Sequence, residues 1–298
     1  MKLNYKIIDN KYYNIKEVLK NYFQISDRLL TKLKKNNKIF LNNTPVFISK
    51  ELSIGDIISV DLDFEETSEN IVPQKQFLDI VFEDEALLII NKPSNVTIHP
   101  SMSHFKDSIS NGVKFYFNSI GLKRKIRPVN RLDKNTSGIV IFAKNEYIQE
   151  CLIKQMKNNI FKKEYYAILE GFLTQADGTI NAPISRKNNS IIEREINLNG
   201  DVSVTHFKLI KNFNSKLDNS KLSFVHFILE TGRTHQIRVH SKYMNHPILG
   251  DSLYGNSSNL ITRQALHAYK VSFIHPITQE KIILEIDLPN DIKKIIEE

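Results

Sequence analysis

The chain has 298 residues, of which 41% are hydrophobic and 25% charged, enough for roughly two domains that each bury a core, and this composition excludes disorder over most of its length. It shows no apolar run near the roughly 18 residues of a membrane helix and no signal peptide in MKLNYKIIDN, so we expect a cytoplasmic protein with no membrane partner. The net charge of +8 fits a polyanionic partner, although surface lysines also serve solubility.

The charge is unevenly distributed along the chain. Residues 11–50 hold nine Lys or Arg against two acids, whereas residues 51–70 hold seven acids and no base. A basic module followed by an acidic linker is therefore expected. We place the first domain at residues 1–65, the linker at 66–76 and a second, larger domain at 77–298.

The basic module reads as helix, turn, helix and then short strands. Ser26 or Asp27 can cap the second helix. On that helix Arg28, Lys32 and Lys35 recur at i, i+4 and i+7, which places them in one basic stripe. A solvated helix face is the alternative interpretation of such a stripe, because surface lysines are common.

In the larger domain, strands outnumber helices and do not alternate strictly with them. This pattern predicts an α+β fold with a mixed, largely antiparallel sheet and peripheral helices, next to a small N-terminal α/β domain. The expected elements, in chain order, are a strand pair in FLDIVFEDEALLIINKPS, a strand at 139–143, a helix in EYIQECLIKQMKNN, a strand in KKEYYAILEG, strands near 204–210 and 222–230, a helix near 235–245 and a C-terminal hairpin.

Several common chemistries lack their signatures. The sequence has no phosphate-binding loop, no GxGxxG, no HExxH and no G-x-S-x-G. His235 and His240 are five residues apart, a spacing that separates their rings on either a helix or a strand, and Cys151 has no cysteine neighbour. We therefore expect no metal site.

Asp133 stands in a turn-rich loop, NRLDKNTSG, ahead of a strand. Asp and Asn are natural turn residues, so a structural turn is one reading of this carboxylate. A carboxylate that stays ionised in a partly buried cleft needs a cation, and Arg233 in TGRTHQIR is the candidate partner. Sequence spacing alone does not establish that the two residues meet.

Four segments in this order resemble the RluA-type pseudouridine synthases over roughly residues 77–290. They are IINKPSNVTIHP, RPVNRLDKNTSGIVIFAKN, KKEYYAILEG and LETGRTHQIRVHSKYMNHPILGDSLYG. The resemblance implies an enzyme that isomerises specific uridines to pseudouridine through a catalytic aspartate and base flipping, without a cofactor. With the basic N-terminal module, the layout resembles that of the members that modify large-subunit ribosomal RNA.

The resemblance also implies roles for single residues. Asp133 matches the catalytic aspartate, and Arg131 the arginine that fills the space left by the flipped base. Tyr165 matches the tyrosine that packs on the target base, Arg233 the arginine that pairs with the aspartate, and Ile237 an aliphatic residue of the pocket.

The N-terminal block, SDRLLTKLKKNNKIFLNNTPV followed by GDIISV, resembles the S4-like RNA-binding domain. This implies that Arg28, Lys32 and Lys35 contact RNA phosphates, which position the protein without reading bases. The two resemblances together imply RNA as the partner, and we expect large-subunit ribosomal RNA. A monomer is the expected state.

Three positions depart from the family pattern: Asn130 replaces a common His, Asn95 replaces a Gly, and Ser241 replaces a Leu. Asn tolerates the left-handed conformation that Gly often supplies.

Two other functions stay open on the sequence. One is a noncatalytic RNA-binding protein, and the other a carboxylate-based hydrolase, which would use two carboxylates.

Overall fold

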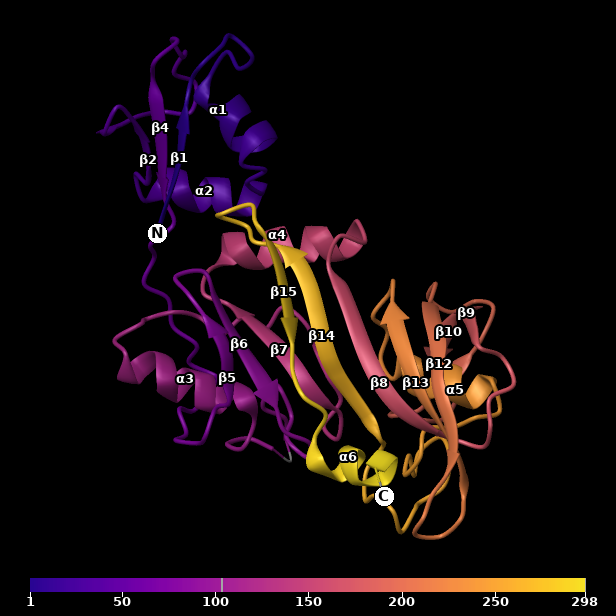
Figure 1. Ribbon diagram of the computed structural model, residues 1–298. Helices are drawn as coiled ribbons and strands as arrows, with labels where there is room; N and C mark the ends of the chain where they lie inside the picture. Colours follow the sequence, from indigo (N-terminus) through magenta and orange to yellow (C-terminus); the bar gives the residue numbers. More distant parts are fainter. Residues whose placement is uncertain (103, 298) are drawn as a thin grey trace.

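The N-terminal residues of the computed structural model, which describes residues 1–102 and 104–297, form a small antiparallel sheet with helices packed on it (Figure 1). Ser26 caps the second helix by accepting a hydrogen bond from the Leu29 amide, as the sequence predicts. The first strand was not predicted from the sequence. The elements are β1 (Lys2–Lys6), α1 (Ile15–Glu17), the π-helical turn η1 (Val18–Tyr22), α2 (Asp27–Lys35), β2 (Ile39–Leu41), β3 (Thr44–Pro45) and β4 (Ile57–Asp61), with the sheet order β1-β4-β2-β3.

The rest of the chain is built around a nine-stranded sheet in the order β5-β6-β7-β14-β8-β13-β12-β9, with β15 paired to β14. Only the β7–β14 pair is parallel among the strand pairs of the described residues, so the predicted mixed, largely antiparallel α+β fold is confirmed. Its strands are β5 (Ile80–Glu83), β6 (Leu87–Lys92), β7 (Ser137–Ala143), β8 (Lys162–Glu170), β9 (Asp177–Asn181), β12 (Val204–Asn214), β13 (Lys221–Leu229), β14 (Leu266–Ile274) and β15 (Lys281–Glu285).

Four helices and a hairpin complete this larger part. The predicted helix near 235–245 is α5, whereas α3 and α6 were not predicted. The elements are α3 (Ile109–Ser119), α4 (Glu146–Lys157), the hairpin of β10 (Ile184–Arg186) and β11 (Arg194–Ile196), α5 (Gln236–Tyr243) and α6 (Asn290–Glu297).

Strand β7 is buried on both faces, which explains its unbroken apolar run GIVIFA. Ile139 and Ile141 pack into the core that includes residues of α4, while Val140 and Phe142 pack into the core that includes residues of α3. Successive side chains of a strand point to opposite faces, so helices cover both. The loop that carries Asp133 leads directly into this rigid strand.

Gly138 allows β7 to approach β14 closely at the start of their parallel pairing. Its φ is +127°, and a Cβ at this position would lie 2.3 Å from the Ala268 carbonyl oxygen. A side chain cannot be accommodated there without moving the backbone. The glycine thus fixes where the strand begins, five residues after Asp133.

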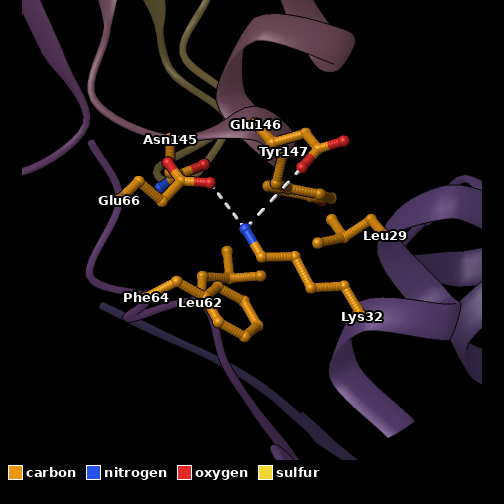
Figure 2. A pocket seen from close by; sticks show the side chains of 8 residues that line it. All are labelled: Leu29, Lys32, Leu62, Phe64, Glu66, Asn145, Glu146 and Tyr147. Atoms are coloured by element: carbon orange, nitrogen blue, oxygen red, sulfur yellow. Dashed lines mark hydrogen bonds and ion pairs between the residues drawn. The ribbon is translucent and has the colours of Figure 1, made fainter. Parts of the chain in front are cut away.

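The N-terminal part is bound to the larger part at the contact between α2 and α4 (Figure 1). The Lys32 ammonium lies 2.5 Å from Glu66 and 3.9 Å from Glu146, and it points between them in Figure 2. Arg127 donates two further hydrogen bonds to Glu66, at 2.7 and 3.0 Å. Burial raises the pKa of Glu66, but the hydrogen bonds from Arg127 and Lys32 outweigh it and hold that pKa below its usual value.

The acidic segment between the two parts is therefore attached rather than free. Residues 62–79 form no helix or strand, yet Asp63 pairs with Arg124 as Glu66 does with Arg127. The domain boundaries at residues 65 and 77 remain a prediction. No helix in the described part of the chain is both long and apolar enough to span a membrane.

Candidate active site

A cavity of about 690 Å³ opens beside the loop that precedes β7. Its walls come from that loop, the start of β8, the end of β13 and the turn that follows β13. Four predicted site residues line it, and a smaller adjoining cavity of about 60 Å³ shares them and adds the fifth, Ile237. The four are Arg131, Asp133, Tyr165 and Arg233.

The arginine that pairs with Asp133 is Arg238, so the predicted pairing with Arg233 is wrong. Arg238 Nη1 donates a hydrogen bond to Asp133 Oδ2 at 3.0 Å. Arg233 instead lies 3.7 Å from Asp201 and donates through Nε to the Val202 carbonyl oxygen at 3.1 Å. Arg233 thus lies at the rim of the cavity.

The local fold explains this exchange of roles. Helix α5 begins at Gln236, so Arg233 belongs to the turn before it and Arg238 to its first turn. Gln236 fixes the turn, because its Oε1 accepts from the Arg233 amide at 2.9 Å and its Nε2 donates to the Val204 carbonyl oxygen at 3.0 Å. These bonds turn the Arg233 side chain toward β12. Arg238 is then the arginine that faces Asp133.

Arg238 is itself held on its other side by Asp251. Its Nε and Nη2 donate to the two oxygens of Asp251 at 2.7 and 2.8 Å, a bidentate arrangement. The guanidinium also lies 5.0 Å from the centre of the Tyr254 ring. Burial lowers the pKa of Arg238, but the carboxylates of Asp251 and Asp133 outweigh it and raise that pKa, so the cation is permanent.

His235 adds a second group beside the same carboxylate. The Arg194 amide donates to the Tyr254 hydroxyl oxygen at 2.8 Å, so the Tyr254 proton is free to be donated to His235 Nδ1, 2.9 Å away. In a neutral imidazole the remaining proton is then on Nε2, which lies 3.7 Å from Asp133 Oδ2. Burial, with the nearby Arg238 and Arg194 charges, lowers the pKa of His235 despite the opposing effect of Asp133 and favours this neutral form.

His235 also has a left-handed backbone, with φ of +59°. Such a conformation costs a residue with a Cβ roughly 1–2 kcal/mol. Strain of this kind persists where the surrounding contacts impose it, and it is often found at functional sites. Here it brings the imidazole beside Asp133.

Tyr165 lies on β8 with its ring 5% exposed. Burial raises the pKa of its hydroxyl, and the nearby charge of Asp133 raises it further, so the phenol stays protonated near neutral pH. The side chain lines both cavities beside Asp133. A planar aromatic wall next to a carboxylate suits a flat, uncharged ring as ligand.

Lys92 binds the loop that carries Asp133 through its side-chain ammonium. Its side chain is fully buried, and the ammonium donates to the carbonyl oxygens of Pro93, Val96 and Lys134 at 2.8, 2.9 and 3.0 Å. Burial lowers the pKa of Lys92 to about 7. The three acceptors nevertheless suit the charged form, because only the ammonium has three protons to donate.

Two of the three departures from the family pattern, Asn130 and Asn95, have structural roles. Asn130 is buried, donates to the Ile139 carbonyl oxygen at 2.9 Å and accepts from the Ile141 amide at 2.9 Å, which ties the loop to β7. Asn95 has φ of +63°, the left-handed conformation that its replacement of Gly predicts. Ser241 is buried on α5.

The three basic residues that were predicted to form one stripe on α2 differ in their partners and exposure. Lys32 is bound to Glu66 and Glu146, and Arg28 lies 3.1 Å from Glu146 although its side chain is 83% exposed. Lys35 is exposed and makes no ion pair with any residue that the structure describes. RNA contact by these three residues remains a prediction, and Lys32 would have to leave its carboxylates to make one.

The sequence reasoning missed Arg238, His235 and Lys92. Arg238 and His235 stand within the same TGRTHQIR segment as Arg233, so the motif was found but the residue facing Asp133 was not. Lys92 had a visible signal, a lysine at the end of the apolar run ALLIIN. Lysine is almost never fully buried unless it is paired, so a lysine in an otherwise buried strand indicates a side chain with a specific binding role in the interior.

Comparisons with known proteins show that the chain is similar to RNA pseudouridine synthases. A family model described as RNA pseudouridylate synthase matches residues 86–243. The uncharacterised RNA pseudouridine synthase YjbO of Bacillus subtilis is 40% identical over 273 residues, which cover 91% of this chain and 94% of that protein. The ribosomal large subunit pseudouridine synthase D of Neisseria meningitidis serogroup B is 32% identical over 280 residues, covering 90% of this chain and 73% of that protein.

Among solved structures, the human RNA pseudouridylate synthase domain containing 1 is similar in fold. It has a TM-score of 0.59 and 24% sequence identity, and the match covers 71% of this chain and 83% of that chain.

Proposed function

Because this chain belongs to the RNA pseudouridylate synthase family and is therefore an RNA pseudouridine synthase, we propose that Asp133 carries its chemistry and that its substrate is large-subunit ribosomal RNA. The similarity to the ribosomal large subunit pseudouridine synthase D supports this choice of RNA. The net charge of +8 is consistent with a polyanion as substrate.

The observation that supports the role of Asp133 is the asymmetry of its carboxylate. Oδ2 accepts the hydrogen bond from Arg238 and faces His235, whereas Oδ1 makes no hydrogen bond or ion pair within the described part of the chain. One oxygen orients the group, and the other is available to form a bond with the substrate. A carboxylate that is held through one oxygen and has the other free can act as a nucleophile.

The reaction breaks the bond between N1 of uracil and C1′ of ribose and joins C1′ to C5. The proton on C5 leaves to solvent or a base, and N1 takes one up. No electrons are gained or lost overall, so the isomerisation needs no redox cofactor. Asp133 would bond either to C1′ as the bond to N1 breaks or to C6 of the uracil ring, and that bond to Asp133 would break again once C5 is joined to C1′.

The target uridine must leave its stack to reach Asp133, at a cost of a few kcal/mol. Arg131, exposed at the mouth of the cavity and without an ion pair among the described residues, is placed to fill the vacated space. Tyr165 offers the flipped base a stacking surface worth roughly 1–3 kcal/mol. Ile237 supplies an apolar contact in the adjoining pocket.

A carboxylate-based hydrolase is disfavoured by the state of the second nearby carboxylate. Hydrolases of this kind use a pair of carboxylates that flank the bond. Asp251 is 1% exposed and has both oxygens bound to Arg238. It is not available to activate water, and Glu230, the other acid that lines the larger cavity, lies 2.6 Å from His206.

The role of Asp133 is tested with the variant Asp133→Asn, which keeps the shape but removes the nucleophile. We expect no pseudouridine, measured by tritium release from C5-labelled RNA, with RNA affinity within a few fold of the wild type. Asp177→Asn, an exposed acid on β9, is the matched control and should keep full activity. Pseudouridine formation by Asp133→Asn would refute the assignment.

The choice of RNA is tested separately, by mapping pseudouridine in ribosomal and transfer RNA from cells with and without this protein. Loss of pseudouridine from large-subunit ribosomal RNA is expected. Loss from transfer RNA alone would leave the enzyme class intact and overturn the proposed substrate.

A further inference from the structure

Lys163 is a cation of the same cavity, and it has no ion-pair partner among the described residues. It lies on β8 two residues before Tyr165, so the alternation of side chains along a strand puts both on one face. Its ammonium lies against the turn after β13, where a Cβ built on Gly232 would come within 2.9 Å of Nζ. Both residues line the cavity.

The ammonium of Lys163 makes no ion pair or hydrogen bond with any residue in the described ranges. Burial alone lowers its pKa to about 8, with no neighbouring carboxylate to oppose the effect. A cation that is withdrawn from water without a partner is costly. Lys163 is half-buried. Lys92, which is fully buried near the loop, has three carbonyl acceptors, so the lack of partners is particular to Lys163.

The acids that line the cavity do not compensate Lys163. Asp133 is bound to Arg238, and Glu230 lies 2.6 Å from His206. Three further basic side chains, Arg131, Lys157 and Arg233, line the same walls. The cavity thus has an excess of positive charge around the position where the reacting nucleotide has to enter.

The spacing of Lys163 and Tyr165 suits one nucleotide. Two residues along a strand are about 7 Å apart, a span that a base stacked on the tyrosine and its own phosphate can bridge. A phosphodiester is a permanent anion with free oxygens, which matches an ammonium without a partner. A phosphate contact positions the RNA without reading its bases.

We propose that Lys163 binds a backbone phosphate of the substrate RNA next to the flipped uridine, and so positions that nucleotide over Asp133. The inference rests on the proposed function. The lysine is a substrate-positioning residue, and it takes no part in moving protons.

The first test measures the protonation of Lys163 with and without RNA. The Asp133→Asn variant is treated with a limiting amount of an amine-acylating reagent across a range of pH, and labelling of each lysine is read by mass spectrometry. The probes are transcripts of large-subunit ribosomal RNA and of transfer RNA. Because a bound phosphate stabilises the ammonium, RNA should move the labelling midpoint of Lys163 upward from about 8, toward the ordinary 10.5.

Lys162, the neighbouring residue that faces the other side of β8, is the matched control and should show no such movement. A midpoint that both RNAs leave unchanged for Lys163 would overturn the proposal. This measurement needs no turnover, so it is decided separately from whether the wild-type protein forms pseudouridine.

The second test separates binding from chemistry. Lys163→Met should raise KM at least tenfold, leave kcat within about threefold, and reduce the slope of log affinity against log salt by about 1. Lys163→Arg, which keeps the charge, should restore KM to within a few fold, and Lys162→Met should behave as the wild type. A Lys163→Arg variant with lost kcat and unchanged KM would indicate a proton-transferring lysine and contradict the proposal, even if Lys163→Met does not fold.

Discussion

Arg238 donates a hydrogen bond to Asp133 at 3.0 Å while the same guanidinium holds Asp251 with two others at 2.7 and 2.8 Å. One arginine therefore joins the proposed nucleophile to a buried carboxylate that cannot move. The geometry of Asp133 depends on this fork, because a planar guanidinium fixes both the distance and the direction of its acceptors.

We expect Arg238→Lys to lower kcat by roughly 10- to 100-fold. Lysine keeps the charge but cannot bond both carboxylates in the same geometry, and a hydrogen bond to a charged group contributes roughly 1.5–3 kcal/mol, at 1.36 kcal/mol per tenfold in rate. Arg233→Lys is the matched control and should change KM more than kcat, because that residue lies at the rim. The measurement is steady-state tritium release with thermal unfolding as a check on folding.

The opposite pattern, with kcat lost in Arg233→Lys and kept in Arg238→Lys, would contradict the structural pairing. A variant that replaces Arg238 by Gln and Asp251 by Asn together removes both buried charges at once. If this double variant folds but forms no pseudouridine, the lost activity is due to catalysis and not to the instability of an unpaired Asp251.

Tyr254→Phe should lower kcat, and it should also cost some stability because the Arg194 amide loses its acceptor. The change removes the proton that Tyr254 donates to His235 Nδ1, so the imidazole can adopt the tautomer whose Nε2 has no proton to direct at Asp133. A decrease of about tenfold in kcat with an unchanged KM is expected. Wild-type kcat in a Tyr254→Phe protein would show that the tautomer of His235 has no bearing on the reaction.

The fold class could be predicted from the sequence because it depends on local patterns, such as apolar runs and capping residues. Strand β7 reads as an apolar run, and the Ser26 cap and the helix α5 have recognisable beginnings. Asp133, Tyr165 and Ile237 were named as site residues through the resemblance of their segments to the family, and the structure brings all three to two adjoining cavities.

What the sequence could not decide is which side chains meet across the fold. Arg233 and Arg238 are five residues apart in one motif, and only the start of α5 at Gln236 determines which of them faces Asp133. The same holds for Glu66, which could have paired with any of 41 basic residues and is bound by Arg127 and Lys32. Long-range pairing of charges leaves no periodic trace in a single sequence.

Lys92→Met should destabilise the protein more than it slows the enzyme. Methionine fills a similar volume but leaves three partly buried carbonyl oxygens without their donor, and a hydrogen bond to a charged group contributes roughly 1.5–3 kcal/mol. The loss is partly offset because a buried charge is removed as well. Urea unfolding should show a clear decrease in stability, with Lys75→Met, at an exposed position, as the control. Equal stability of the two variants would mean that the three hydrogen bonds are replaced by water.

Glu66→Gln should weaken the attachment of the N-terminal part in a pH-dependent way. The folded-state pKa of Glu66 lies below its ordinary value of 4.5, so the charged carboxylate stabilises the fold above about pH 4.5, and this contribution is lost as the pH falls through the folded-state pKa. The free energy of unfolding of the wild type should therefore exceed that of Glu66→Gln at pH 7, and the difference should shrink below pH 4.5. Glu65→Gln is the matched control: Glu65 is 77% exposed and pairs only with exposed Lys123, so this variant should unfold as the wild type does at both pH values. A difference between the wild type and Glu66→Gln that is the same at pH 7 and at pH 3.5 would show that packing, and not the charge of Glu66, holds the two parts together.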